Sequence, residues 1–289
     1  MVKRYADLYL DARKALLPTE GQSAAQVARE LLSKISGKSA AEILADRELY
    51  ASDEIGEQLD ECVRRVADGE PLPYILEEWD FCGMTLRVTR DTLIPRDDTV
   101  AVTDLAIKKT MFLEQNPRIL DLCTGTGCIG LAIAKRVKDA RVTLADVSVP
   151  ALNIARQNAA AMHFGPRVNC VQADALQQAP AFLRNYNLLV SNPPYVTDAE
   201  MEALPPSVRR FEPELALRGG PDGLTFYRAI VQNYTRVLAE EGYLCLEFGM
   251  GQETAVSQIL TDGGYEILSY QKDNQDITRA VIARKKREG

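Results

Sequence analysis

The sequence predicts an α/β protein with a doubly wound, mostly parallel sheet, preceded by a small helical bundle. Short apolar stretches alternate with helical ones from about residue 97 onward, and a G-x-G-x-x-G pattern follows the first of these stretches. Residues 2–68 show helical spacing throughout. Alternating strands and helices are typical of parallel sheets, and 289 residues suffice for two domains.

The N-terminal domain, residues 1–76, is predicted to be a bundle of four or five helices. Ser39 and Glu42 frame a capping box, and Gly37 stands where a helix should end. Apolar residues recur at i, i+3 and i+4 spacing, as in Tyr5, Leu8, Tyr9, Ala12 and Leu16.

Residues 77–92 are predicted to form a β-hairpin that links the bundle to a catalytic domain of residues 93–289. The stretch EWDFCGMTLRV alternates like two short strands around Gly83. No helix is expected within residues 69–96, because this stretch contains Pro71, Pro73 and Pro95.

The catalytic domain is predicted to contain a seven-stranded sheet. Helices are expected at residues 97–114, 128–138, 150–162, 175–184, 224–239 and 252–263. Strands are expected at residues 118–123, 141–147, 168–174, 187–192, 242–248, 265–272 and 278–285. Because no helix separates the last two strands, we expect them to form an antiparallel pair.

The composition argues against several classes of function. No stretch approaches about 18 apolar residues and acids interrupt the N-terminal apolar pattern, so we expect a cytoplasmic protein without membrane association. A net charge of −7 argues against tight nucleic-acid binding. The six cysteines form no C-x-x-C pair and His163 is the single histidine, so we predict no metal site.

A nucleotide-like cofactor is expected at the glycine-rich turn. In DLCTGTGCIG, Gly125, Gly127 and Gly130 lie between a strand and a helix, which is the Rossmann-like context of this motif. Asp146 ends the next strand about 20 residues further on, where a carboxylate reaches ribose hydroxyls. This pair suits NAD as well as S-adenosylmethionine.

Two further aspartates favour S-adenosylmethionine over a dinucleotide. Asp121 ends the first strand and is expected to face the middle of the ligand, where it would repel a pyrophosphate. Asp174 ends the third strand and is placed to accept a hydrogen bond from the adenine amino group, with helix capping as the alternative. The predicted cofactor is therefore S-adenosylmethionine, and S-adenosylhomocysteine is its product.

The stretch LLVSNPPYV ends the fourth strand with residues that cannot continue a ladder. This strand is expected beside the first, so Asn192 to Tyr195 should face the cofactor crevice. Neither Pro193 nor Pro194 has an N–H, which leaves nearby carbonyls free and rigidly held.

These four residues are suited to bind a planar group that carries an NH₂. The Asn192 side-chain oxygen and the Pro193 carbonyl can each accept one proton, and Tyr195 can pack against the flat face. Asn192, Pro193 and Tyr195 are the predicted catalytic residues, and with Pro194 they form the predicted substrate site. The tetrapeptide does not separate a nucleobase amine from a glutamine or asparagine amide.

Five motifs in this order, LIPRDDT, DLCTGTGCIG, NPPYV, FEPELALRGGPDGLTFYR and LEFGMGQ, resemble the HemK/PrmC family of protein-(glutamine-N(5)) methyltransferases. The resemblance covers nearly the whole chain. It implies an S-adenosylmethionine-dependent methyltransferase fold and methylation of the glutamine in the Gly-Gly-Gln loop of peptide chain release factors. It also implies a cofactor pocket formed by Cys123, Thr124, Gly125, Thr126, Gly127, Asp146, Asp174, Ala175 and Asn192, with Arg96 and Thr99 at its lid or floor.

The chain departs from the family at two places. Arg96-Asp97-Asp98-Thr99-Val100 stands where Arg-Pro-acid-Thr-Glu is common, and Cys123 stands where glycine is common. Cys123 is small, and we do not assume that the backbone there needs a conformation that only glycine adopts, so we expect this replacement to leave cofactor binding intact. For Arg96, the alternative to a role at the pocket is a salt bridge. Glu212 could orient the substrate or brace its own segment, and both alternatives stay open. Glu247 is expected to be a structural partner rather than a catalyst.

Other functions remain open from the sequence. They are methylation of another glutamine, for example in a ribosomal protein, methylation of an adenine amino group in nucleic acid, NAD-dependent oxidoreduction, and a catalytically idle adaptor. We expect a monomer that acts on a release factor without direct nucleic-acid binding. The helical bundle is expected to dock this protein substrate, because a Gly-Gly-Gln loop alone offers little surface.

Overall fold

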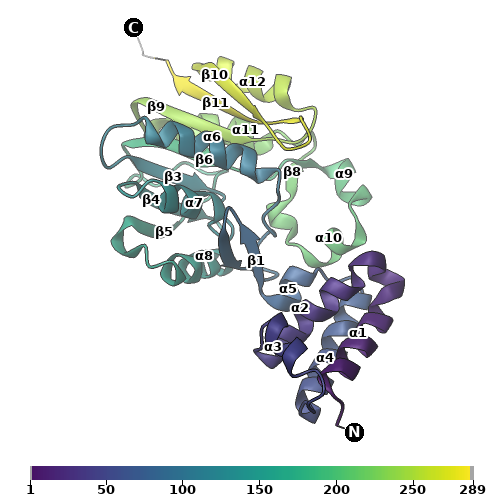
Figure 1. Cartoon of the computed structure of the whole chain (residues 1–289). Helices are drawn as coiled ribbons and strands as arrows, with labels where there is room; N and C mark the ends of the chain where they lie inside the picture. Colours follow the sequence, from purple (N-terminus) through teal and green to yellow (C-terminus); the bar gives the residue numbers. More distant parts are fainter. Residues whose placement is uncertain (1, 287–289) are drawn as a thin grey trace. The chain divides into compact units, whose positions relative to one another are not determined.

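A computed structural model describes residues 2–286, which form two compact units (Figure 1). The first unit runs to Glu78 and also includes Pro206–Phe211. The second unit comprises Trp79–Pro205 and the described residues from Glu212 onward. Pro206–Phe211 was not expected in this unit, because it lies far from the other helices in the sequence.

The first unit consists of helices around an apolar core. Its helices are α1 (Tyr5–Glu20), α2 (Ala24–Ser36), α3 (Ala40–Ala45), α4 (Asp53–Ala67), α5 (Leu72–Leu76) and α10 (Pro206–Phe211). Leu16 and Leu31 are fully buried in this core. The predicted capping box is confirmed, because the Ser39 hydroxyl accepts from the Glu42 N–H and the Glu42 carboxylate accepts from the Ser39 N–H.

Helix α5 corrects the expectation that prolines exclude a helix in this region. Pro71 is the N-cap residue, and Pro73 lies in the first turn. The N–H groups of a first turn have no partner within the helix, so proline costs little there.

The second unit is built on a seven-stranded sheet with the order β10-β11-β9-β6-β3-β4-β5. Its strands are β3 (Arg118–Leu122), β4 (Arg141–Asp146), β5 (Val168–Gln172), β6 (Tyr186–Ser191), β9 (Leu238–Glu247), β10 (Tyr265–Lys272) and β11 (Thr278–Lys285). The first five of these pair in parallel, whereas β11 is antiparallel to both β9 and β10. This confirms the predicted doubly wound sheet and its final antiparallel pair.

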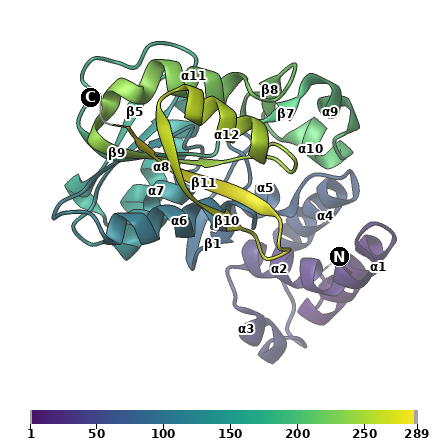
Figure 2. The same ribbon diagram turned by 90° about the horizontal axis from the view of Figure 1, so that it is seen from above.

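Helices cover both faces of this sheet (Figure 2). One face packs against α6 (Thr99–Met111), α7 (Cys128–Arg136) and α8 (Val149–Ala161). The other face packs against α11 (Thr225–Tyr234) and α12 (Glu253–Asp262). Successive strand residues therefore enter opposite cores, Ile119 the first and Leu120 the second, as is typical of sheets buried on both sides.

Two small sheets accompany the large one. Strands β1 (Glu78–Phe81) and β2 (Met84–Arg87) form the predicted hairpin. The second small sheet, which was not predicted, pairs β7 (Val196–Thr197) with β8 (Arg218–Gly220), and helix α9 (Asp198–Ala203) follows β7 directly.

The helix predicted at residues 175–184 is wrong. Asp174 Oδ1 accepts a hydrogen bond from the Leu176 N–H and closes a local turn, and Pro180 lacks the N–H that a helix would need. The segment is a loop.

The helix predicted at residues 224–239 is too long. It ends at Tyr234, and a 3₁₀ turn follows. Strand β9 then begins at Leu238 instead of Gly242, because Leu238 pairs with Tyr186 of β6. Among residues 2–286, no helix is long and apolar enough to cross a membrane.

Candidate active site

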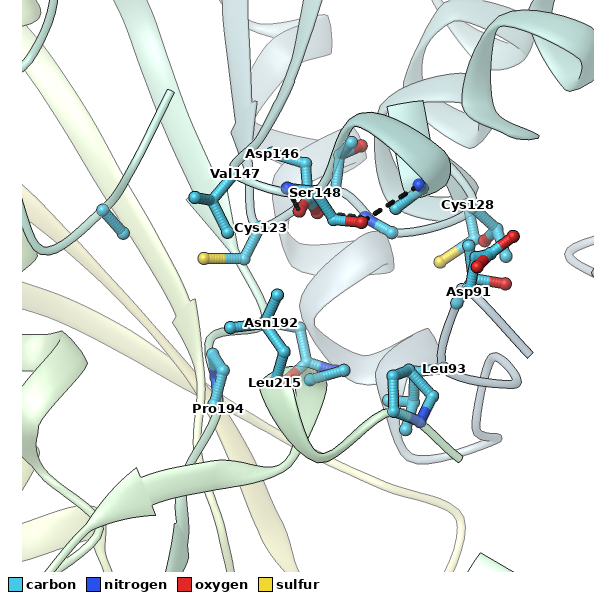
Figure 3. A pocket seen from close by; sticks show the side chains of 18 of the residues that line it. Asp91, Leu93, Cys123, Cys128, Asp146, Val147, Ser148, Asn192, Pro194 and Leu215 are labelled. Atoms are coloured by element: carbon cyan, nitrogen blue, oxygen red, sulfur yellow. Dashed lines mark hydrogen bonds between the residues drawn. The ribbon is translucent and has the colours of Figure 1, made fainter. Parts of the chain in front are cut away.

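A cavity of about 300 Å³ opens at the carboxyl ends of β3, β4, β5 and β6. Parallel strands expose their carboxyl ends on one edge, and β3 lies between β4 and β6 where the strand order reverses. The lining comes from the residues after each strand, with loops that include Leu93 and Leu215 closing the rest. Figure 3 shows the side chains of Asp146 and Asn192 on two sides of the lining, with Cys123 between them.

The glycine-rich turn owes its shape to two different properties of glycine. Gly125 and Gly127 have φ of +52° and +85°, which side chains disfavour. Gly130 is needed for space, because a Cβ there would lie 2.4 Å from Leu144 Cδ2 of β4. Helix α7 therefore packs directly on the sheet and directs its N-terminus toward the cavity.

Asp121 lies beneath this turn and not in the cavity. Its Oδ2 accepts hydrogen bonds from the Thr124 hydroxyl at 2.6 Å and from the Gly130 N–H at 2.9 Å. Burial raises the pKa of this carboxyl to about 7, although both hydrogen bonds act in the opposite direction. The fully buried Asp121 side chain is directed under the turn and lies outside the cavity lining, so the expected approach of its carboxylate to the ligand stays a prediction.

Asp146 and Asp174 both line the cavity and both hold local backbone. Asp146 accepts from the Gly125 N–H and the Ser148 N–H, each at 2.9 Å. Burial raises the pKa of Asp146, and these hydrogen bonds lower it. Each carboxylate oxygen has more than one lone pair, so both residues keep capacity for ligand hydroxyl or amino groups.

Cys123 occupies a backbone conformation that favours glycine. Its φ is +61°, so the assumption that no glycine-only geometry applies here is corrected. Holding a non-glycine residue in this region costs about 1 kcal/mol. Burial raises the pKa of the Cys123 thiol, which therefore stays protonated near neutral pH.

The Asn-Pro-Pro-Tyr corner follows β6, as predicted. Asn192 and Pro194 line the cavity, and Asn192 Nδ2 donates to the Thr99 Oγ1 at 3.2 Å. Pro193 is buried and outside the lining. The Tyr195 ring packs against Gly249, where a Cβ would lie 3.0 Å from Tyr195 Cδ2, and it is also outside the lining.

The back of this corner is held by the segments around β8 and after β9. A Cβ on Gly219 would lie 2.7 Å from Tyr195 Cα, and a Cβ on Gly223 would lie 2.3 Å from the Tyr195 carbonyl oxygen. Gln252 Nε2 donates to the same carbonyl at 3.2 Å. Gln252 was not among the residues predicted from the sequence, where its one signal is that it ends the LEFGMGQ motif.

Glu212 braces the loop that precedes α6. Its buried carboxylate accepts from the Ile94 N–H at 3.3 Å and pairs with the Arg96 guanidinium. Glu212 therefore braces its segment, and Arg96 forms the salt bridge that was the alternative to a role at the pocket.

Ten of the residues proposed from sequence share the cavity lining: Thr99, Cys123, Thr124, Gly125, Thr126, Asp146, Asp174, Ala175, Asn192 and Pro194. Five do not: Arg96, Asp121, Gly127, Pro193 and Tyr195. For all fifteen residues, the catalytic and binding roles stay predictions. The apolar lining residues Leu93 and Leu215 were missed, because single apolar residues outside helices and strands follow no period. Phe226, in the first turn of α11, was also missed.

Comparisons with known proteins place this fold and cavity in the methyltransferase class. Residues 103–205 match the methyltransferase small domain, and residues 7–76 match the PrmC N-terminal domain. A methyltransferase of known structure from Pyrococcus furiosus has a TM-score of 0.51 and 17% identity, with 70% of this chain and 89% of that one covered, which shows the shared fold.

Closer relatives define the family. A release factor glutamine methyltransferase from Clostridium acetobutylicum is 31% identical over 96% of this chain and 97% of its own length. Another, from Geobacter sulfurreducens, is 37% identical over 77% of this chain and 76% of its own. The chain belongs to the family of release factor glutamine methyltransferases.

Proposed function

We propose that this protein transfers the methyl group of S-adenosylmethionine to the side-chain amide nitrogen of the Gly-Gly-Gln glutamine in a peptide chain release factor. The observation that carries the proposal is that one cavity joins the glycine-rich turn to Asn192 and Pro194 in a member of this family. A cofactor and a planar amide can thus meet within one cavity.

The charge of the lining fits S-adenosylmethionine better than a dinucleotide. Its ionisable acidic and basic side chains are three aspartates and one arginine, namely Asp91, Asp146, Asp174 and Arg90. An acidic lining favours a sulfonium and an ammonium group and opposes a pyrophosphate. Asp146 would hold the ribose hydroxyls and Asp174 the adenine amino group, and the bound cofactor would supply an electrophilic methyl carbon.

The protein's own contribution is to hold and polarise the amide. An amide nitrogen is a weak nucleophile because its lone pair is delocalised. The Asn192 side-chain oxygen and the Pro193 carbonyl would accept hydrogen bonds from its two N–H groups and so favour the positive charge that develops on nitrogen. Bound S-adenosylmethionine would supply the methyl group and retain the C–S bonding electrons as the thioether of S-adenosylhomocysteine, and one amide proton would leave to solvent.

The test is to map the modified atom. The purified protein is incubated with isotope-labelled S-adenosylmethionine and, separately, with a release factor, a ribosomal protein preparation and DNA, and the products are analysed by mass spectrometry. We expect one methyl group on the Gly-Gly-Gln glutamine and none on a release factor in which alanine replaces that glutamine. A methyl group on a nucleobase, or no transfer to the release factor, would contradict the proposal.

We also propose that the first unit docks the release factor. Removal of residues 1–70 should then raise KM for the release factor at least tenfold with little change in cofactor affinity. An unchanged KM would contradict this role.

A further inference from the structure

One fully buried acid, Glu247, has no part in the steps above. It is the last residue of β9 and is 1% exposed. Its Oε2 has no hydrogen-bond partner among residues 2–286. A buried carboxyl with an unpartnered oxygen costs stability, so its position calls for a functional explanation.

Two side chains connect this carboxyl to the cavity. Thr99 and Asn192 adjoin the Glu247 side chain, where their polar groups lower its pKa, and Asn192 Nδ2 donates to the Thr99 Oγ1 at 3.2 Å. Thr99 and Asn192 line the cavity, whereas Glu247 does not. Glu247 can therefore act on a ligand through these two residues without touching it.

The hydrogen bonds in this group have a direction. The Thr99 oxygen accepts from Asn192, so its own hydroxyl proton is available for Glu247. An ionised carboxylate can only accept, and it therefore attracts the N–H₂ end of the Asn192 side chain. The oxygen end is then left for the cavity. The opposite orientation would present N–H groups to a substrate NH₂, which cannot accept them.

We propose that Glu247 is a positioning residue. Its ionised carboxylate, directly and through Thr99, sets the orientation of the Asn192 side-chain amide so that the Asn192 oxygen accepts a hydrogen bond from the substrate amide N–H. This inference rests on the proposed function, because only an amide substrate requires that orientation. Methyl transfer then depends on the ionisation of a residue that never touches the substrate.

The arrangement predicts a specific pH dependence. Burial raises the pKa of Glu247 to about 8, against the opposing effects of Thr99, Arg279 and Asn192. A protonated carboxyl can donate and so permits the reversed Asn192 orientation. The ordering is therefore lost as pH falls through about 8, and turnover should rise with pH across this range.

Neighbouring groups do not produce the same step. The charged or titratable groups that face Glu247 are Asp98, Arg279, Tyr195, Tyr227 and Cys128. Asp98 and Arg279 pair with each other at 2.9 Å. Burial raises the pKa of Tyr195, Tyr227 and Cys128, which keeps all three neutral up to about pH 9.

The variant Glu247→Gln preserves shape and removes the ionisation. In the full-length protein we expect cofactor affinity and KM for the release factor to stay within about twofold of wild type, while single-turnover methyl transfer at pH 9 falls about tenfold. The wild-type increase between pH 7 and pH 9 should disappear. Asp121, with a pKa of about 7, is present in both proteins, so any step that it causes persists in the variant.

A second readout needs no substrate. The side-chain ¹⁵N–¹H resonances of Asn192, assigned by their loss in Asn192→Asp, should shift with a midpoint near pH 8 in wild type and stay constant in Glu247→Gln. A variant with the wild-type rate and pH profile, or Asn192 resonances insensitive to pH, would overturn the inference. If these resonances titrate as expected but no methyl reaches the release factor, the proposed function fails instead, and with it the catalytic meaning of the orientation.

Discussion

Two buried carboxyls, Asp121 and Glu247, lie beneath different parts of the cavity and differ in what they hold. In residues 2–286, each has one oxygen without a hydrogen-bond partner. Burial raises their pKa values to about 7 and about 8. Asp121 accepts hydrogen bonds from the Thr124 hydroxyl and the Gly130 N–H of the glycine-rich turn, whereas Glu247 adjoins the cavity-lining side chain of Asn192, which lowers its pKa.

This difference separates binding from chemistry. A carboxyl that fixes backbone shapes a surface that recognises the cofactor in the same way before and during the reaction. A carboxyl that orients a side-chain amide controls a group that acts on charge developing in the transition state. Substitutions at the turn should therefore change cofactor affinity, and substitutions at the Asn-Pro-Pro-Tyr corner should change turnover.

The largest effect is expected at the corner itself. Asn192→Ala removes one of two acceptors for the substrate amide, so turnover should fall about a hundredfold or more. Cofactor affinity, measured by calorimetry, should change much less. Turnover within threefold of wild type would show that another residue positions the amide.

The next effect tests how rigidly the corner must be held. In Gly223→Ala the new Cβ would lie 2.3 Å from the Tyr195 carbonyl oxygen, so the corner must shift. Misplacement of a catalytic group by about 1 Å can cost up to about a hundredfold, and we expect a loss of at least tenfold in kcat.

Gly251→Ala is the matched control for this variant. Gly251 has a φ of +84°, similar to the +70° of Gly223, but a Cβ would meet nothing within 4 Å. It should lose about 1 kcal/mol of stability and keep its turnover. Equal kcat values for the two variants would show that contact with Tyr195 is irrelevant.

A smaller effect is expected beneath the glycine-rich turn. Asp121→Asn places an NH₂ group at the position of Oδ1, which is buried and has no hydrogen-bond partner among residues 2–286. The cost of about 1 to 3 kcal/mol should distort the turn and weaken cofactor binding about tenfold. At saturating cofactor, kcat should stay within about threefold. A large fall in kcat with unchanged cofactor affinity would contradict the assignment of Asp121 to cofactor binding and of Glu247 to turnover.

The smallest effect is expected at Cys123. Replacement by glycine relieves the strain of a φ of +61° but increases the entropy of the unfolded chain. The free energy of unfolding, measured by denaturant titration, should change by no more than about 1 kcal/mol, with activity retained. A tenfold loss of activity would show that the thiol contributes to the cavity.

Local patterns predicted most of the fold. Strands β10 and β11 have the predicted bounds, because alternation and flanking turn residues mark them clearly. Helix α5 and the loop after Asp174 were missed, because both depend on where a proline falls within a turn.

The site was predicted less completely for a physical reason. Strand ends bring residues to one edge of a sheet, but the direction of each side chain depends on its register, which decides between cavity and core. Asp121 therefore lies under the turn. The contacts of Gln252 with Tyr195 and of Glu247 with Thr99 join residues far apart in the chain, and no local pattern contains them.

The claim that one cavity brings cofactor and amide together is tested most directly by a crystal structure with S-adenosylhomocysteine. The account predicts that the thioether sulfur lies beside Asn192, within reach of a methyl group transferred to an amide held there. A sulfur atom directed away from the Asn192 to Tyr195 corner would contradict it.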